Sequence, residues 1–514
     1  MMQLREHIFS SSNYPVGRPE GKWLITVGRI CVTPFSQKPA RTILFVLLFA
    51  SVPFFIPKLG GAIRVRGESY AALLPNVREL VTFKANKSAS TSMMPGSSSS
   101  PLDSSPEPAV DSTDPCAARL IDDPGRVLDK FYSSLAETDA RKAGAITRIT
   151  HYGDSPITND GITGTARRLM QERFGDAGHG FMLIDRPWAW YGHQAISFTS
   201  GGGWTSDSFM NPRVNDGAFG LGGVTFRADG AGKYARYATV SEGDTGRNFT
   251  RFEIYYLQKP GGGQFNVTVN GADHDNVSTD GEGPRSAFIK VSAPKTGANT
   301  FEVKTQSGNV RLFGAVLEND GPGVVYDSLG VNGAYAGLLK TVMNEQHWSE
   351  QLQHRHPNLV ILNYGTNESE YASDDQMGRY ERDLREVVKR VHTALPTTPI
   401  LIISPMDRGK RAGGGKVITL ESIPRIVEMQ QRVAHETGCG FFNMFAAMGG
   451  EGTMSRWHAG KKHLVGADLT HPNADGAETV GELIYEALLD GYGKYQARTS
   501  AKLQLVATGE KNKR

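Results

Sequence analysis

The feature that most restricts the fold of this chain is a series of short, uniformly apolar runs that alternate with amphipathic stripes. Residues 359–362 (LVIL) and 399–403 (PILII) are apolar throughout, which is typical of strands buried on both faces. Between them, apolar residues recur every three or four positions from Met377 to Val391, which predicts a helix. Residues 145–150 and 480–488 continue the pattern as a strand and a final helix. This alternation predicts a parallel sheet between helices, in three α/β/α layers.

A glycine-rich region between residues 204 and 320 interrupts this alternation. Residues 251–257 and 264–269 alternate apolar with polar or smaller positions, and the KPGGG between them is typical of a hairpin loop. Further strand-like runs occupy residues 223–228, 234–240, 287–292, 301–304 and 310–317, with no helical pattern among them. We therefore expect an antiparallel β-sandwich inserted into the α/β domain.

Short polar motifs follow the expected strands of the α/β domain. They are Gly153-Asp154-Ser155, Gly330-Val331-Asn332-Gly333, Gly365-Thr366-Asn367-Glu368 and Asp468-Leu469-Thr470-His471. Active sites of open α/β sheets lie at the carboxyl ends of the strands, so we expect these motifs to meet there.

The residue types in these motifs suit ester hydrolysis. A serine hydroxyl attacks a carbonyl only when a base takes its proton, and His471 is the predicted base for Ser155. Asp468 is expected to orient the imidazole. Negative charge that develops on the carbonyl oxygen needs hydrogen-bond donors. The predicted donors are the backbone N–H groups of Ser155 and Gly333 and the side-chain amide of Asn367.

These residues resemble the SGNH (GDSL) hydrolase superfamily, over residues 146 to about 488 without the predicted sandwich. The matching motifs are HYGDS, GVNGA, YGTNE and DLTHP. The resemblance implies an SGNH-hydrolase (flavodoxin-like) fold, with Ser155 as nucleophile, Asp468 and His471 as acid and base, and Gly333 and Asn367 as oxyanion donors. Gly330 is the alternative to Gly333.

A longer stretch of sequence resembles one particular group within this superfamily. The run KFYSSLAETDARKAGAITRITHYGDS, followed by RFGDAGHGF, is similar to bacterial peptidoglycan O-acetylesterases with an inserted carbohydrate-binding-like module. Pro156 departs from the simplest family pattern, because proline supplies no N–H directly after the nucleophile. The lipase-type G-x-S-x-G motif is absent from the sequence, which argues against the α/β-hydrolase fold.

Each predicted site residue also has a purely structural interpretation. Ser155 can be a helix N-cap, Gly333 a tight turn, Asn367 a turn former, and Asp468 with His471 a surface turn. The presence of all the motifs in this order favours the catalytic interpretation. For other candidates the structural interpretation is preferred: a strand-end histidine at His151, and core positions for the aromatic residues Trp188, Trp190, Tyr191 and Trp204.

Charge and metal-ligating residues exclude other classes of protein. The formal net charge is +3 with both signs interspersed, which argues against a nucleic-acid binder. The three cysteines, Cys31, Cys116 and Cys439, form no CxxC motif; free buried thiols are favoured over a Cys116–Cys439 disulfide. No zinc ligand set is evident around His354, His356, His458 or His463, so we expect no metal and no cofactor.

The N-terminal part is predicted to attach the enzyme to a membrane. Residues 42–56 (TILFVLLFASVPFFI) are uncharged and would extend about 22 Å as a helix. This suits a signal peptide or a short anchor; no clear A-x-A cleavage motif follows, so an uncleaved anchor is favoured over cleavage or a buried core segment. Residues 84–115, rich in Ser, Pro and Thr, predict a disordered tether.

We therefore expect the following organisation. An N-terminal basic segment (1–41) precedes the anchor or signal segment (42–58) and a disordered linker (59–115). The hydrolase domain (116–203 and 321–498) is split by the sandwich (204–320), and a polar tail (499–514) follows. The predicted activity is removal of O-acetyl groups from a cell-envelope polysaccharide such as peptidoglycan.

The alternatives are a lipid esterase or thioesterase, an O-acetyltransferase, and a noncatalytic polysaccharide-binding protein. The expected partners are an acetylated polysaccharide or small ester and, through the N-terminal segment, a membrane. The expected location is the periplasm, anchored to the inner membrane, or outside the cell if the signal is cleaved.

Overall fold

A six-stranded sheet lies at the centre of the α/β domain. Its strands are, in spatial order, β16 (Gly323–Gly330), β4 (Ile146–Gly153), β17 (Leu359–Asn363), β18 (Ile400–Ile403), β21 (Gly440–Phe442) and β3 (Ile121–Asp122). All neighbouring pairs are parallel except β21 with β3. The expected parallel sheet is present, with one antiparallel strand added at its edge.

The computed structural model describes residues 64–65, 68–69, 120–294, 298–370 and 373–511. The first two pairs form an antiparallel ladder, β1 (Arg64–Val65) with β2 (Glu68–Ser69). The remaining described elements belong to one compact unit, Asp103–Arg514.

Alternate residues of the central strands enter two separate apolar cores. Val360 and Ile402 belong to one core, whereas Ile361 and Leu401 belong to the other, and all four are buried. Side chains of a strand point alternately to opposite faces, so both faces of this sheet are covered. This is why the LVIL and PILII runs lack polar positions.

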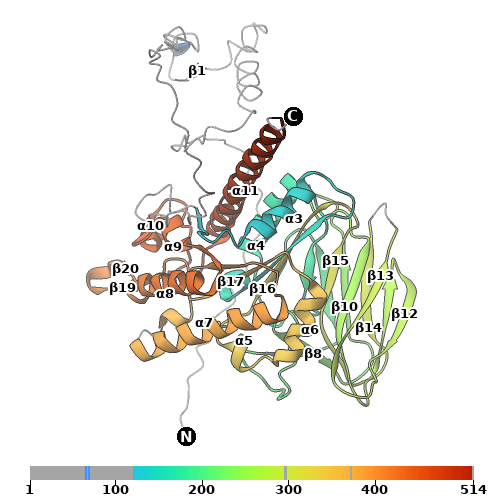
Figure 1. The fold of residues 1–514 in the computed structure, drawn as a ribbon. Helices are drawn as coiled ribbons and strands as arrows, with labels where there is room; N and C mark the ends of the chain where they lie inside the picture. Colours follow the sequence, from blue (N-terminus) through green and yellow to red (C-terminus); the bar gives the residue numbers. More distant parts are fainter. Residues whose placement is uncertain (1–63, 66–67, 70–119, 295–297, 371–372, 512–514) are drawn as a thin grey trace, which may run out of the picture. The chain divides into compact units, whose positions relative to one another are not determined.

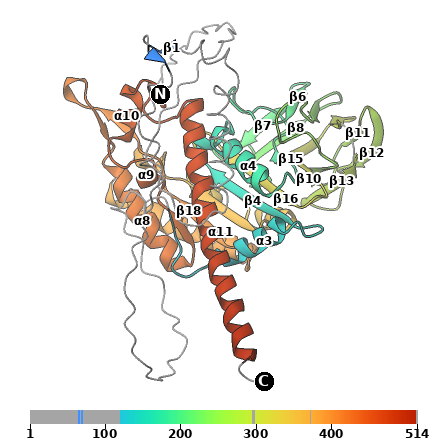
Figure 2. The ribbon, with the colours of Figure 1, turned by 90° about the horizontal axis from the view of Figure 1, so that it is seen from above.

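Helices cover the two faces (Figure 1). One layer contains α3 (Asp129–Asp139), α4 (Gly161–Phe174) and α11 (Ala474–Lys511), and Figure 2 shows α11 passing beside α3 and α4. The other contains α6 (Glu345–Arg355), α7 (Asp374–Ala394) and α8 (Ser422–Thr437). Helix α11 continues past residue 498, where we expected a polar tail to begin.

Two antiparallel sheets form the inserted region (Figure 1). One contains β13 (Arg285–Ser292), β10 (Arg251–Gln258), β15 (Val310–Glu318), β8 (Val224–Ala228) and β7 (Thr205–Ser208), with β5 (Gly180–Met182) also paired to β15. The other contains β12 (Ala272–Ser278), β11 (Gln264–Val269), β14 (Thr300–Thr305), β9 (Tyr234–Ala238) and β6 (Ser197–Gly201).

Aromatic contacts join the two antiparallel sheets into a sandwich. Phe252 of β10 stacks on Phe301 of β14 with ring centroids 4.8 Å apart, and also contacts Tyr237 of β9. These sheets also include β5 and β6, which precede residue 204. The sandwich therefore begins earlier in the chain than we expected.

The remaining elements are short. They are η3 (Ser155–Ile157), α5 (Leu338–Thr341), η4 (Glu368–Glu370), β19 (Gly409–Arg411), η5 (Gly413–Gly415), β20 (Val417–Thr419), α9 (Met444–Ala447) and α10 (Thr453–Ala459).

A buried ionic network joins the sandwich to the α/β domain. Glu318, at the end of β15, accepts hydrogen bonds from Arg148 of β4, Arg251 of β10 and Arg355 of α6. Arg355 also donates to both oxygens of Asp327 in β16, at 2.7 and 2.9 Å. The arginines hold the pKa of Glu318 well below its usual range, against the effect of its burial. The sandwich is thus fixed to the central sheet by charged groups.

The N-terminal predictions lie largely outside the described residues. Residues 42–56, the linker at 84–115, Cys31 and Cys116 are not among them. Among the helices that the structure describes, none combines the length and apolar character needed to cross a bilayer. Cys439 is buried with a free thiol, and burial raises its pKa to about 12.

Candidate active site

Strand register brings the predicted site residues to one edge of the central sheet. Gly153, the last residue of β4, pairs with Gly330 of β16 on one side and with Asn363 of β17 on the other. Ser155 lies two residues after the end of β4, Gly333 three residues after the end of β16, and Asn367 four residues after the end of β17. The loops that carry them therefore leave the sheet side by side, at the carboxyl ends of parallel strands.

Ser155, His471 and Asp468 form a hydrogen-bonded chain. Ser155 Oγ lies 2.7 Å from His471 Nε2, and His471 Nδ1 lies 2.6 Å from Asp468 Oδ2. A carboxylate can only accept, so Nδ1 carries the ring proton and Nε2 of the neutral imidazole accepts from the serine hydroxyl. This is the arrangement that a nucleophile, its base and an orienting acid require.

A tight turn before α11 positions the imidazole. Asp468 Oδ1 accepts the backbone N–H groups of Thr470 and His471, each at 3.1 Å, and the N–H of Gly466 donates to the carbonyl of His471. These bonds leave Oδ2 for the ring. Burial alone would raise the pKa of Asp468, but the hydrogen bonds from His471 and Thr470 hold it below its ordinary value. The carboxylate therefore stays ionised.

Close packing requires glycine in front of the nucleophile. A Cβ on Gly153 would lie 2.6 Å from the side chain of Ile157, which belongs to the short helix η3 that begins at Ser155. Pro156 occupies the first turn of η3, where proline is tolerated. Because Pro156 has no N–H, the donor available at this turn is the N–H of Ser155 itself.

Two of the predicted oxyanion donors, Gly333 and Asn367, line a common pocket. Gly333 has φ +74°, in the left-handed region that favours glycine, and it lines the pocket together with Asn367. Asn367 Nδ2 donates to the carbonyl of Ala334 at 2.7 Å, which fixes the amide and leaves its second hydrogen for another acceptor. Gly330, the alternative to Gly333, is instead the last paired residue of the β16–β4 ladder and is not among the residues that line this pocket. The position of Gly333 in the pocket lining therefore favours Gly333 over Gly330 as the backbone oxyanion donor.

This pocket is larger than an acetyl group requires. Its volume is about 710 Å³, and its lining includes Tyr335, Tyr380 of α7 and Met210 of the inserted region. The Met210 Cε atom lies 3.7 Å from the place where a Cβ of Gly333 would be. The inserted sandwich therefore contributes to the wall of the pocket beside the predicted oxyanion hole.

Two carboxyl groups inside the motifs, those of Glu368 and Asp154, were given no role in the sequence analysis. Partly buried Glu368 accepts the backbone N–H groups of Ala336, at 2.9 Å, and Gly365, at 3.1 Å. It thereby ties the loop after β16 to the loop after β17. Burial raises the pKa of Glu368 to about 7, against these hydrogen bonds. Burial and the neighbouring Glu368 raise the pKa of Asp154 to about 8.

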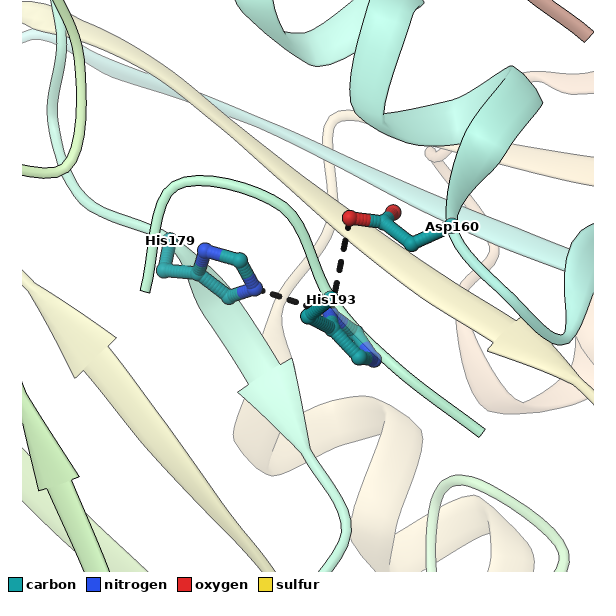
Figure 3. A group of neighbouring side chains, drawn as sticks. All are labelled: Asp160, His179 and His193. Atoms are coloured by element: carbon teal, nitrogen blue, oxygen red, sulfur yellow. Dashed lines mark hydrogen bonds and ion pairs between the residues drawn. The ribbon is translucent and has the colours of Figure 1, made fainter. Parts of the chain in front are cut away.

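A second cluster that the sequence did not reveal contains Asp160, His179 and His193, whose side chains approach one another (Figure 3). One possible ligand atom from each residue lies within 4.8 Å of the others, as a metal site requires. His179 Nε2 is 2.8 Å from His193 Nδ1, which is 3.8 Å from Asp160 Oδ2. Burial lowers the pKa of His193 to about 4 and that of His179 well below its ordinary value, so both rings are neutral.

The carboxylate of this cluster already has a full set of partners. The guanidinium of Arg167 donates to both oxygens of Asp160. Thr163 donates to Oδ1, and the N–H of Gln194 donates to Oδ2. A cation would have to displace Arg167, so the chemistry of this cluster fits a buried ion pair better than a metal site.

Most of the histidines and aromatic residues for which we expected a structural role are buried or packed against other side chains. His151 is fully buried in β4, with Nδ1 2.8 Å from the hydroxyl of Tyr326, which confirms the structural interpretation. Tyr191 and Trp204 are core residues, as expected, whereas Trp190 is 53% exposed. His354 stacks on Phe288 and lies 2.9 Å from Glu253.

Part of the chain matches a known family. Residues 286–479 match the sequence model of the GDSL-like lipase/acylhydrolase family. The match begins within β13 and therefore does not include Ser155. It includes Gly333, Asn367, Asp468 and His471.

Individual relatives cover different parts of the chain. An acetylxylan esterase of Xylanibacter ruminicola is 28% identical over 165 residues, which is 28% of this chain and 31% of that protein. The chain thus spans about a third of that relative. A solved structure described as a peptidoglycan O-acetylesterase in action is 24% identical, with a TM-score of 0.59, and the match covers 71% of this chain and 96% of that one. It shares the fold.

Proposed function

Because the chain carries a domain of the GDSL-like lipase/acylhydrolase family, whose members hydrolyse esters, we propose that it removes O-acetyl groups from a cell-envelope polysaccharide such as peptidoglycan. The observation that carries the proposal is the 2.7 Å contact between Ser155 Oγ and His471 Nε2, beside a pocket lined by Gly333 and Asn367.

The reaction proceeds through an acetyl-enzyme. His471 Nε2 takes the hydroxyl proton as Ser155 Oγ bonds to the acetyl carbon, and Asp468 stabilises the imidazolium. The N–H groups of Ser155 and Gly333 and the amide of Asn367 hold the oxyanion. The sugar oxygen leaves with the proton from His471. Water then gives its proton to His471 and attacks the acetyl carbon, which releases acetate and restores Ser155.

The acetyl group and the glycan are supported by the likeness to other proteins. The names of the acetylxylan esterase and the peptidoglycan O-acetylesterase share the acetyl ester and differ in the polysaccharide. A pocket that extends beyond the oxyanion donors also suits a bulky alcohol more than a small one.

The test is acetate release by the full-length protein from O-acetylated peptidoglycan and from acetylated xylan, with Ser155→Ala as the control. We expect acetate from peptidoglycan, no release by the variant, and poor hydrolysis of long-chain acyl esters. Preference for long chains would favour a lipid esterase or thioesterase, and acetyl transfer to an added sugar would favour a transferase. Glycan binding without any Ser155-dependent turnover would contradict the proposal.

We also propose that residues 42–56 anchor the protein to a membrane, with the catalytic domain outside the cytoplasm. The support is the apolar, uncharged character of this segment and the Ser/Pro-rich stretch after it. Protease added to intact spheroplasts should remove the catalytic domain from membrane-bound protein. Protection from protease until the membrane is permeabilised would overturn this location.

A further inference from the structure

We propose that the pocket beside Gly333 and Asn367 binds an acetylated sugar that carries a carboxylate, and that Arg379 is the residue that pairs with this carboxylate. This inference rests on the proposed esterase function and adds the charge of the substrate. It concerns a residue outside the catalytic motifs.

The position of the pocket makes its occupant part of the substrate. Gly333 and Asn367, the proposed oxyanion donors, line it, so a molecule that fills it lies next to the reacting carbonyl. The rest of the lining comes from α5 and the residues before it, from η4, from α7 and from Met210 of the inserted region. With a volume of about 710 Å³, the pocket has room for a sugar beyond the acetyl group.

The carboxyl groups of the lining already have cation or N–H partners in the protein. Asp383 lies 2.9 Å from Lys340, and Glu370 lies 2.5 Å from Arg408. The carboxyl group of Glu368 accepts two backbone N–H groups, as described above, and burial raises its pKa to about 7. The charges of Asp383 and Glu370 are therefore balanced by cations, and Glu368 is only partly ionised near neutral pH.

Arg379 is the basic residue of the described lining, and its charge has no such compensation. It is an exposed residue of α7, and among the described residues no carboxylate lies within the 4.0 Å of an ion pair with its guanidinium. A guanidinium presents a planar pair of donors that matches a carboxylate. The unmatched charge in the pocket is thus positive and favours an anionic ligand.

The apolar part of the lining suits a sugar ring. Tyr335 follows Gly333 by two residues, lines the pocket and is 41% exposed, so an aromatic side chain is accessible to the pocket's occupant. Met210 and Met377 add apolar surface from the inserted region and from α7. An aromatic face with a nearby cation binds both the C–H face and the carboxylate of an acidic sugar.

Two kinds of sugar carry this chemistry: muramic acid whose lactyl carboxyl group is not joined to a peptide, and a uronic acid. Binding is measured calorimetrically with deacetylated muramic-acid disaccharide, galacturonic-acid dimer and neutral xylobiose, on the full-length Ser155→Ala protein. This background holds ligand without turnover. We expect one or both acidic disaccharides to bind, and the tighter one identifies the source of the carboxylate.

Arg379→Gln should weaken binding of the acidic ligand about three- to fivefold, because an ion pair made by an exposed guanidinium contributes up to about 1 kcal/mol. Arg379→Glu should weaken it further, and xylobiose should be unaffected by both variants. Arg382→Gln is the matched control, because Arg382 is also exposed on α7 but is outside the described lining. Tyr335→Ala should weaken the binding of acidic and neutral sugars alike.

Equal affinity of the Ser155→Ala protein and its Arg379→Gln derivative for the acidic ligands would overturn the inference, as would tighter binding of xylobiose than of either acid. The proposed function is judged separately, by Ser155-dependent hydrolysis of 4-nitrophenyl acetate, a neutral ester without a sugar. Loss of that activity with retained Arg379-dependent binding would remove the esterase assignment and leave the binding site.

Discussion

Replacing Arg355 by methionine should destabilise the protein strongly. The three side chains in its ion pairs are nearly inaccessible, with exposed fractions of 3% for Arg355, 7% for Glu318 and 0% for Asp327. Without Arg355, Glu318 keeps Arg148 and Arg251, whereas Asp327 keeps only neutral donors, Thr150 and the N–H of Phe181, in the described network. One buried carboxylate is therefore left without a cation, which costs about 3–5 kcal/mol of unfolding free energy.

The assay is urea unfolding, followed by tryptophan fluorescence and far-UV circular dichroism, whose transitions must coincide for a two-state treatment. Adding Asp327→Asn to Arg355→Met should recover part of the loss, because the uncompensated charge is removed. Lys142→Met is the control: Lys142 and Glu137 are 65% and 53% exposed, so the loss should stay below about 1 kcal/mol. A loss of about 1 kcal/mol or less for Arg355→Met, or no recovery in the double variant, would refute this reasoning.

Three further predictions concern the site. Asn367→Ala should lower kcat on 4-nitrophenyl acetate about 10²–10³-fold with little change in KM, and an unchanged kcat would exclude the amide as an oxyanion donor. Gly333→Ala should cost about 1–2 kcal/mol of stability in urea unfolding and also reduce kcat, because alanine disfavours φ +74°. The raised pKa of Asp154, about 8, means that the native state binds more protons than the unfolded state between about pH 4 and 8. Stability should therefore fall as pH rises through this window, less steeply in Asp154→Asn; equal slopes would contradict the shift.

Much of the fold was predictable because local pattern and tertiary structure agree. The uniformly apolar runs in β17 and β18 are buried on both faces, and the alternating run of β11 has alternating burial. Strand β10 differs from its expected alternation, because residues 252–257 are all buried. Strand β12 was not predicted, because its sequence ADHDNVS is polar and largely exposed. Its place depends on pairing with β11, which no local pattern reveals.

The residues that carry out chemistry were easier to predict than those that surround them. Ser155, Asp468 and His471 occur in short motifs, and their side chains are hydrogen-bonded to one another. Glu368 directly follows Asn367, but its raised pKa depends on burial by distant segments. Met210 enters the pocket from the inserted region, and sequence spacing gives no sign of that contact.

Covalent labelling with a serine-directed organophosphonate, read out by peptide mass spectrometry, tests the central claim most directly. We predict one stoichiometric adduct on the peptide that contains Ser155, no adduct on that peptide in Ser155→Ala, and much slower labelling in His471→Gln. An adduct on a different serine, or hydrolysis of acetyl esters that persists in Ser155→Ala, would contradict the assignment of Ser155 as the nucleophile.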